Sequence, residues 1–337
     1  MATYKQSGVD VELGDKCSAI AYKYAKSTFP SRRHLKGKAL LDDGGFTGAI
    51  DMGDYFMVQN ADGVGTKMMV AERMKKFGSL GADLVAMVAD DAICVGAEVI
   101  AMTNVIDTNK LDSATVDSMM KGLAKVCIKE KILIPGGEIA ELSEMVNVYS
   151  WNATAVGIVE KKKMITGKGI KNGDVIIGLL SPNFRSNGFS LVRHILKKSY
   201  GDSWHNVKFH GKKWGDIVLA PSIVYHGALL ELLGRFGKKR KVNIKGIAHI
   251  TGGGLTGNFP RILPKENMDF ALDNLPPPPP AMKELQRLGD VSDEEAYATW
   301  NMGVGMTLVV AKRDVKKTLE LVKKQGLKAQ VIGRIGK

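Results

Sequence analysis

The chain has 337 residues, 45% of them hydrophobic, and a formal net charge of +13. This length supports two domains that each bury a core. No apolar run is long enough to span a bilayer, and the first residues lack the apolar stretch of a signal peptide. The three cysteines form no C-x-x-C pattern, which favours a reducing compartment without a zinc site. We therefore expect a cytoplasmic protein.

The positive charge lies in short lysine clusters that are spread along the chain and are not interleaved with aromatic residues. That distribution is typical of solvated surface, and the excess charge favours phosphorylated small molecules. We expect neither a nucleic-acid partner nor a membrane partner.

Strand-like runs alternate with helical periodicity in the first half, a pattern typical of α/β domains. A basic connector at 160–163 precedes a new apolar strand that starts at Val175. We place the domain boundary at residue 167, which gives domains 1–167 and 168–337. The predicted strands cover 55–61, 99–106, 132–134, 154–159, 175–180, 244–249, 304–310 and 329–333, and the predicted helices cover 80–95, 113–129, 188–198, 221–236 and 315–325.

A glycine-rich turn, Asp62-Gly63-Val64-Gly65-Thr66-Lys67, follows the first of these strands. Glycines let backbone N–H groups approach phosphate oxygens, lysine adds a positive charge, and aspartate is a hard ligand for a metal ion. The turn therefore suits a magnesium-bound polyphosphate, although its spacing is not that of a P-loop. An ordinary loop with a surface lysine is the alternative.

The mostly apolar helix predicted after this turn carries Asp83, Asp90 and Asp91. Spacings of seven and eight place the three carboxylates near one face, and burial without a partner costs several kcal/mol. A cation is the expected partner. The alternative is that Asp83 stabilises the helix N-terminus while the other two are exposed. Glu138 follows Gly136-Gly137 at a strand end, where α/β proteins place ligand-binding residues.

A second glycine run, 252–257, matches G-x-G-x-x-G after a strand, with Glu266 and Asp269 downstream as candidate ribose ligands. A nicotinamide-dependent oxidoreductase is therefore an alternative. Pro260 and Pro264 weigh against it because they break any long helix after the glycines.

The chain resembles the phosphoribosylformylglycinamidine cyclo-ligase (AIR synthetase) family. The motifs that carry this resemblance occur in the family's order from end to end, at 4–10, 44–46, 62–67, 91–98, 136–138, 186–191, 248–254, 301–306 and 331–335.

The resemblance implies a two-domain α/β (α+β) fold. The N-terminal domain would have a mixed four-stranded sheet that joins its mate in a homodimer barrel, and the C-terminal domain would be α/β. It implies ATP-dependent closure of the imidazole ring of formylglycinamidine ribonucleotide, with ATP and Mg²⁺ as cofactors. The sister families thiamine monophosphate kinase and selenophosphate synthetase remain alternatives, although the reactive N-terminal cysteine typical of the latter is absent.

The resemblance also implies site residues. His249 and Lys67 are the catalytic candidates, with His249 as acid/base or polarising group. Asp62, Asp91 and Glu138 are candidate magnesium ligands, with Asp90 a weaker one. The candidate ATP-binding residues are Lys5, Asp10, Gly44, Gly45, Phe46, Asp62, Gly63, Gly65, Thr66, Lys67 and Asp91, and the candidate substrate-binding residues are Arg185, Ser186, Asn187, Gly188, Thr251, Gly252, Gly253 and Gly254.

The sequence departs from the family pattern where the substrate is expected. Arg185 stands where histidine is usual before Ser-Asn-Gly, Ile139 replaces a threonine, Asn104 an acid, and Ile223 an arginine. Because a guanidinium stays charged and forked, we expect Arg185 to bind the ribonucleotide phosphate rather than to act as a base, with an exposed surface arginine as the alternative.

Overall fold

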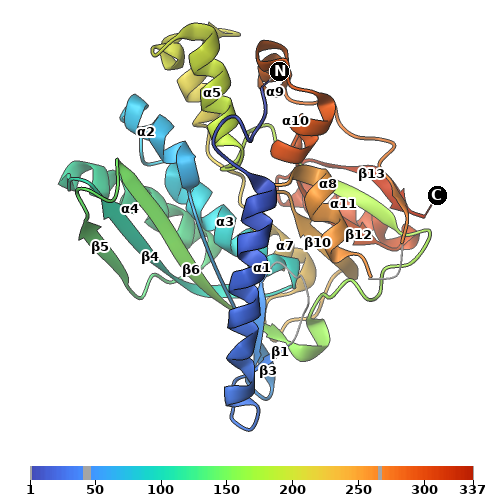
Figure 1. Ribbon diagram of the computed structural model, residues 1–337. Coiled ribbons are helices and arrows are strands. Elements are labelled where there is room, and N and C mark those ends of the chain that lie inside the picture. The colour runs from blue at the N-terminus through green and yellow to red at the C-terminus, as the bar shows by residue number, and fades with distance from the viewer. Residues whose placement is uncertain (1, 41–46, 265–267, 337) are drawn as a thin grey trace.

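The computed structural model describes residues 2–40, 47–264 and 268–336, and it contains two large sheets built from successive halves of the chain. In Figure 1 the first sheet extends from the left to the bottom centre, and the second lies on the right. The change of sheet falls between Glu160 and Val175. No helix among the described residues is long and apolar enough to cross a membrane.

The first sheet is mixed and has six strands in the order β1-β2-β3-β6-β4-β5. Only the β4–β5 pair is parallel. The prediction of four strands needs correction, because two short strands, β1 and β2, extend the sheet beyond β3. The strands are β1 (Lys38–Leu40), β2 (Gly48–Asp51), β3 (Tyr55–Gly63), β4 (Glu98–Thr108), β5 (Gly137–Glu141) and β6 (Tyr149–Glu160).

Two helices, α3 (Leu80–Cys94) and α4 (Ser113–Glu130), pack on one face of this sheet. They approach closely at Gly81, where a Cβ atom would lie 2.3 Å from the backbone nitrogen of Leu123. Nearly all of α3 is buried, because its far side contacts the second half of the chain through α7 and β10. The helix with the predicted acids therefore lies between the two domains.

The second sheet has the order β10-β12-β7-β13-β11, and every neighbouring pair is antiparallel. Its strands are β7 (Val175–Leu180), β10 (Ile244–His249), β11 (Phe270–Ala271), β12 (Val304–Val310) and β13 (Ala329–Ile335). Helices α7 (His226–Leu233) and α11 (Val315–Lys324) share one hydrophobic core with this sheet, and α8 (Gly254–Asn258) packs into another.

This antiparallel sheet contradicts the dinucleotide-binding alternative. A Rossmann fingerprint links parallel strands through a helix, whereas β10 is followed by the five-residue α8 and pairs antiparallel with β12. Glu266, one of the acids considered for that alternative, lies outside the described residues.

Three helices of the second half, α5 (Phe189–Tyr200), α9 (Pro280–Gly289) and α10 (Asp293–Thr299), lie together at the top of Figure 1. Their buried residues join the core of the first sheet, so one hydrophobic cluster runs across the predicted domain boundary. The shorter helices are α2 (Met68–Met74) and α6 (Trp214–Val218). The N-terminal helix α1 (Val11–Ser27) buries none of its residues.

Candidate functional site

Asp83 and Asp90 of α3 are buried, Asp91 is partly buried, and side-chain cations neutralise the first two. Asp83 pairs with the ammonium of Lys67 at 2.8 Å, and Asp90 pairs with Arg185 at 2.8 Å. Asp83 also accepts from the backbone and hydroxyl of Ser222, and Asp90 accepts from the backbone N–H groups of Tyr225 and His226. The expectation of a cation beside these carboxylates is met, but by lysine and arginine.

Lys67 was predicted to contact ATP, but in the structure it is fully buried. Its side chain is 0% exposed, and Nζ donates to Asp83 and to the carbonyls of Arg185 and Ala220. All three N–H bonds of an ammonium are thereby used. Lys67 joins the two halves of the chain, and in this arrangement it presents no donor to a phosphate.

The glycines of the same turn have packing and turn roles. A Cβ atom at Gly63 would lie 2.1 Å from the amide oxygen of Asn152, so only glycine lets β3 end this close to β6. Gly65 has a φ of +65° and starts the short 3₁₀ turn that buries Lys67. Thr66, in the same turn, is exposed.

Asp91 lies at one end of a buried hydrogen-bonded chain. Its Oδ1 is 2.7 Å from Nδ1 of His249, and Nε2 of His249 is 2.8 Å from Nη2 of Arg185. Burial, followed by the charge of Arg185, lowers the pKa of His249 to about 3. Because both ring nitrogens have partners, His249 supports Asp91 in this structure and does not offer a free nitrogen for acid/base chemistry.

Asp62 and Asp91 form the part of the site that can attract a metal ion. Burial raises the pKa of Asp62 to about 6, with a smaller contribution from the nearby charge of Asp91, and burial raises the pKa of Asp91 to about 7. Gly63 donates its backbone N–H to Asp62 at 2.7 Å. Because burial disfavours the ionised form of both carboxylates, a divalent cation that contacts them would favour ionisation.

Glu138 does not join this pair within one chain. The register aligns Asp62 with Ala153, Asn104 and Gly137 across the sheet, so β5 is about 14 Å away at roughly 4.8 Å per strand. Glu138 is one residue further on and therefore points to the opposite face. The described residues contain no cluster of three His, Cys, Asp or Glu side chains that could hold a metal, so the predicted three-carboxylate set is not assembled.

The two predicted substrate segments do come together. The Oγ atom of Thr66 lies 3.5 Å from that of Ser190, in the first turn of α5, and a Cβ atom at Gly252 would lie 3.9 Å from the amide nitrogen of Asn187. The Oγ atom of Ser186 and the Oδ1 atom of Asn187 are buried and have no hydrogen-bond partner among the described residues. Such unpaired polar atoms are available for a ligand.

The backbone of these segments is held in a fixed shape. Gly188 has a φ of +72° and caps α5 without a side-chain hydrogen bond. A Cβ atom there would lie 2.5 Å from the indole of Trp300, so Gly188 cannot be replaced without movement. Asn258 donates from its amide to the carbonyls of Thr251, Gly252 and Gly254, while Gly253 has a φ of +91°.

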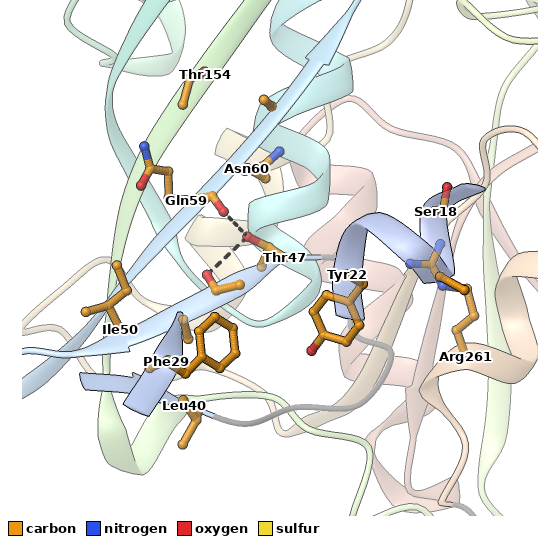
Figure 2. A pocket seen from close by; sticks show the side chains of 15 residues that line it. Ser18, Tyr22, Phe29, Leu40, Thr47, Ile50, Gln59, Asn60, Thr154 and Arg261 are labelled. Atoms are coloured by element: carbon orange, nitrogen blue, oxygen red, sulfur yellow. Dashed lines mark hydrogen bonds between the residues drawn. The ribbon is translucent and has the colours of Figure 1, made fainter. Parts of the chain in front are cut away.

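A cavity of about 860 Å³ lies between α1 and the strands β1, β2 and β3 (Figure 2). Apolar side chains line most of it, and Asn60, two residues before Asp62, lies in its wall beside Gln59 and Thr154. Arg261, whose charge lowers the pKa of Asp91, lines the same cavity. Neither Asp62 nor Asp91 lines the cavity itself, but Asn60 and Arg261 connect its wall to them.

Sequence reasoning missed most of this cavity. Its lining includes Ser18, Tyr22, Phe29, Thr47, Asn60 and Arg261. The amphipathic pattern of α1, capped by Asp10, was the signal that could have indicated it. Lys5 forms an ion pair of 2.8 Å with Asp10 at the start of that helix. Gly44, Gly45 and Phe46 lie outside the described residues.

Comparison with known proteins gives matches over almost the whole chain. The family profile "AIR synthase related protein, N-terminal domain" matches residues 42–159, and "AIR synthase related protein, C-terminal domain" matches 171–337. A phosphoribosylformylglycinamidine cyclo-ligase of Methanocaldococcus jannaschii is 37% identical over 335 residues, covering 99% of this chain and 92% of that protein. One from Clostridium perfringens is 39% identical, covering 99% and 97%.

Solved structures with low sequence identity share the fold. The HypE-HypF complex matches with a TM-score of 0.62 at 15% identity, covering 86% of each chain. A thiamine-monophosphate kinase from Stenotrophomonas maltophilia matches with a TM-score of 0.60 at 18% identity, covering 88% of each chain. At these identities the likeness concerns the fold alone.

Proposed function

This chain belongs to the phosphoribosylformylglycinamidine cyclo-ligase family, as its motifs predicted, and we propose that it catalyses the ring closure for which that family is named. The substrate is formylglycinamidine ribonucleotide and the product is 5-aminoimidazole ribonucleotide, formed in de novo purine biosynthesis with release of ADP and phosphate. The observation that carries this proposal is the match at 37–39% identity over 99% of the chain.

The chemistry requires activation of a formamide oxygen, which is a poor leaving group. The γ-phosphoryl group of ATP is transferred to that oxygen, which breaks its bond to ADP. An amidine nitrogen then attacks the formamide carbon, loses a proton, and phosphate departs with the oxygen. The protein has to align the two substrates and exclude water from the phosphorylated intermediate.

The cavity beneath α1 is the place that suits the nucleotide base and ribose. Its volume of about 860 Å³ lies in the range typical of small-molecule sites, and its wall leads through Asn60 to Asp62. One side of the cavity is covered by α1 and the turn after it, through Ser18, Tyr22 and Phe29, whereas Lys5 and Asp10 do not line it. Lys67 does not bind a phosphate in this proposal, because its three N–H donors already have partners within the protein.

Asp62 and Asp91 would hold a magnesium ion, which when bound neutralises charge on the transferring phosphoryl group. The unpaired oxygens of Ser186 and Asn187, the N-terminus of α5 and the run 251–254 would hold the ribonucleotide. Thr66 follows Asp62 by four residues, and its hydroxyl lies 3.5 Å from that of Ser190 in α5, so it can contribute to either group. His249 acts in this account through Asp91, without contact to substrate.

A homodimer is part of the proposal. The face of the first sheet opposite α3 and α4 carries the partly exposed side chains Met57, Val105, Val156 and Ile158, which the strand register aligns on one side. A second copy of the chain would cover this face, and the barrel predicted from the family would result. Sedimentation of the wild type and of Val156→Lys tests this point: the wild type should be a dimer and the variant a monomer.

Substrate choice is tested by a coupled assay of ADP release in which each candidate substrate is added in turn with ATP and magnesium. The proposal predicts turnover with formylglycinamidine ribonucleotide and none with thiamine monophosphate or selenide. Turnover with either alternative and none with the ribonucleotide would assign the chain to a sister activity. The cytoplasmic location stays a prediction.

A further inference from the structure

We propose that Arg185 is a positioning residue that selects the tautomer of His249 and thereby orients the carboxylate of Asp91. The tautomer of His249 can be determined on the folded protein alone, without metal or substrate. The consequence for magnesium rests on the proposed function, in which Asp91 is a metal ligand.

The guanidinium of Arg185 is enclosed by groups from several elements. Nη2 donates to Oδ2 of Asp90 at 2.8 Å, and Nη1 donates to the carbonyl of Ile223 at 2.8 Å. Its central carbon lies 5.0 Å from the centre of the Tyr225 ring. The side chain is 1% exposed, which contradicts the alternative of a surface arginine and leaves little of the side chain accessible for the predicted phosphate contact.

Nη2 of Arg185 also lies 2.8 Å from Nε2 of His249. A guanidinium has only donors, so Nε2 has to be the unprotonated ring nitrogen. The single proton of the neutral ring is then on Nδ1, which donates to Oδ1 of Asp91 at 2.7 Å. Without Arg185 either nitrogen could carry the proton, and the opposite tautomer would leave two acceptors facing each other at Asp91.

The backbone at this position supports a specific requirement for Arg185. Its φ is +61°, in the left-handed region that favours glycine. A long side chain pays conformational energy there, and such a conformation persists only where its surroundings determine it strongly. The contacts to Asp90, Ile223 and His249 supply that determination.

If Asp91 binds the metal ion as proposed, His249 would be the residue that orients this ligand through a hydrogen bond. A carboxylate ligand is commonly oriented by a hydrogen-bonded partner, and removal of such a partner typically lowers metal affinity by about 10–100-fold. Here the partner is His249, and Arg185 decides which of its nitrogens bears the proton.

The first test is ¹⁵N NMR of the histidine rings in the wild-type protein, with His249→Gln used to assign the His249 signals. The proposal predicts a protonated Nδ1 and an unprotonated Nε2. A protonated Nε2 in the wild type would overturn the proposal without any Arg185 variant.

The second test uses Arg185→Gly, which suits the left-handed backbone and leaves a guanidinium-shaped space. We expect it to lose the fixed Nδ1-protonated state and to bind Mn²⁺, a spectroscopic probe for magnesium, about 10–100-fold more weakly. Guanidinium, added well below denaturing concentrations, should restore both, whereas urea should not. Arg287→Ala, which removes an exposed arginine paired with Glu284, is the control and should change neither.

The outcomes separate the inference from the proposed function. If the wild type binds Mn²⁺ and Arg185→Gly binds it equally well with an unchanged His249 spectrum, the positioning role is wrong. If the wild type shows the predicted tautomer but no Mn²⁺ binding with or without nucleotide, the metal-binding part of the proposed function fails while the assignment of the tautomer stands. If Arg185→Gly does not fold, the wild-type spectrum alone decides: an unprotonated Nε2 supports the proposal and a protonated Nε2 rejects it.

Discussion

Replacement of Lys67 by methionine distinguishes a structural lysine from a phosphate-binding one. Methionine keeps much of the apolar stem but removes the ammonium, which donates at 2.8 Å to Asp83, at 3.0 Å to the carbonyl of Arg185 and at 2.7 Å to that of Ala220. Asp83 would then be a buried carboxylate with only the donors of Ser222.

The expected loss is large because both partners are 0% exposed. Removal of one partner of a buried ion pair costs about 3–5 kcal/mol. At roughly 2–4 °C per kcal/mol for a domain of this size, Tm should fall by about 6–20 °C. Thermal and urea unfolding measure the effect, and a cycle with Asp83→Asn should show coupling of about 0.5–3 kcal/mol.

The matched control is Lys76→Met, which breaks a pair with Asp216 of similar length whose side chains are 57% and 41% exposed. It should cost less than about 1 kcal/mol. The reasoning is refuted if Lys67→Met unfolds within about 1 kcal/mol of the wild type while its KM for ATP rises strongly, because that pattern belongs to a residue whose main contact is with the nucleotide.

Three further predictions concern the carboxylates and the substrate cradle. Because burial raises the pKa of Asp62 to about 6, the folded state holds a proton that the unfolded state has lost, so its stabilising contribution is present below pH 4 and disappears as the pH rises through 6. Without magnesium, the unfolding free energy from urea titrations should therefore decrease between pH 4 and 7 by about 2 kcal/mol less in Asp62→Asn than in the wild type. An unchanged pH profile would contradict the raised pKa. Asp91→Asn should abolish magnesium-dependent nucleotide binding in calorimetry with Tm retained, whereas the exposed Asp54→Asn should leave binding intact; equal affinities in the two variants would remove Asp91 from the metal site. Gly188→Ala should lower Tm by more than Gly201→Ala, since both glycines have a φ of +72° but only the first would place a Cβ atom against Trp300, and equal effects would show that this contact relaxes without cost.

The sequence predicted the buried face of α3 well because helical periodicity is a local property. Spacings of seven and eight placed Asp83, Asp90 and Asp91 together, and burial implied cations. Periodicity did not show that Lys67 is the cation beside Asp83 or that Arg185 is the cation beside Asp90. Those contacts span 16 and 95 positions of the chain. The third acid, Asp91, has a histidine as its partner instead.

Other differences arise where tertiary contacts override local pattern. The helix predicted over 221–236 begins only at His226, because Ser222 and Tyr225 donate their backbone N–H groups to Asp83 and Asp90. The segment at 132–134 makes only a bridge through Leu133, and β5 begins at Gly137, which puts Glu138 on the face away from Asp62. A one-residue change in register is enough for that result.

The most direct test of the proposed reaction follows the oxygen atom of the formyl group. Formylglycinamidine ribonucleotide labelled with ¹⁸O at that atom is incubated with the protein, ATP and magnesium, and the released phosphate is analysed by mass spectrometry. The account predicts one ¹⁸O atom in each phosphate for every ring closed, because the phosphoryl group leaves on that oxygen. Release of label into water, with unlabelled phosphate formed beside the closed ring, would contradict it.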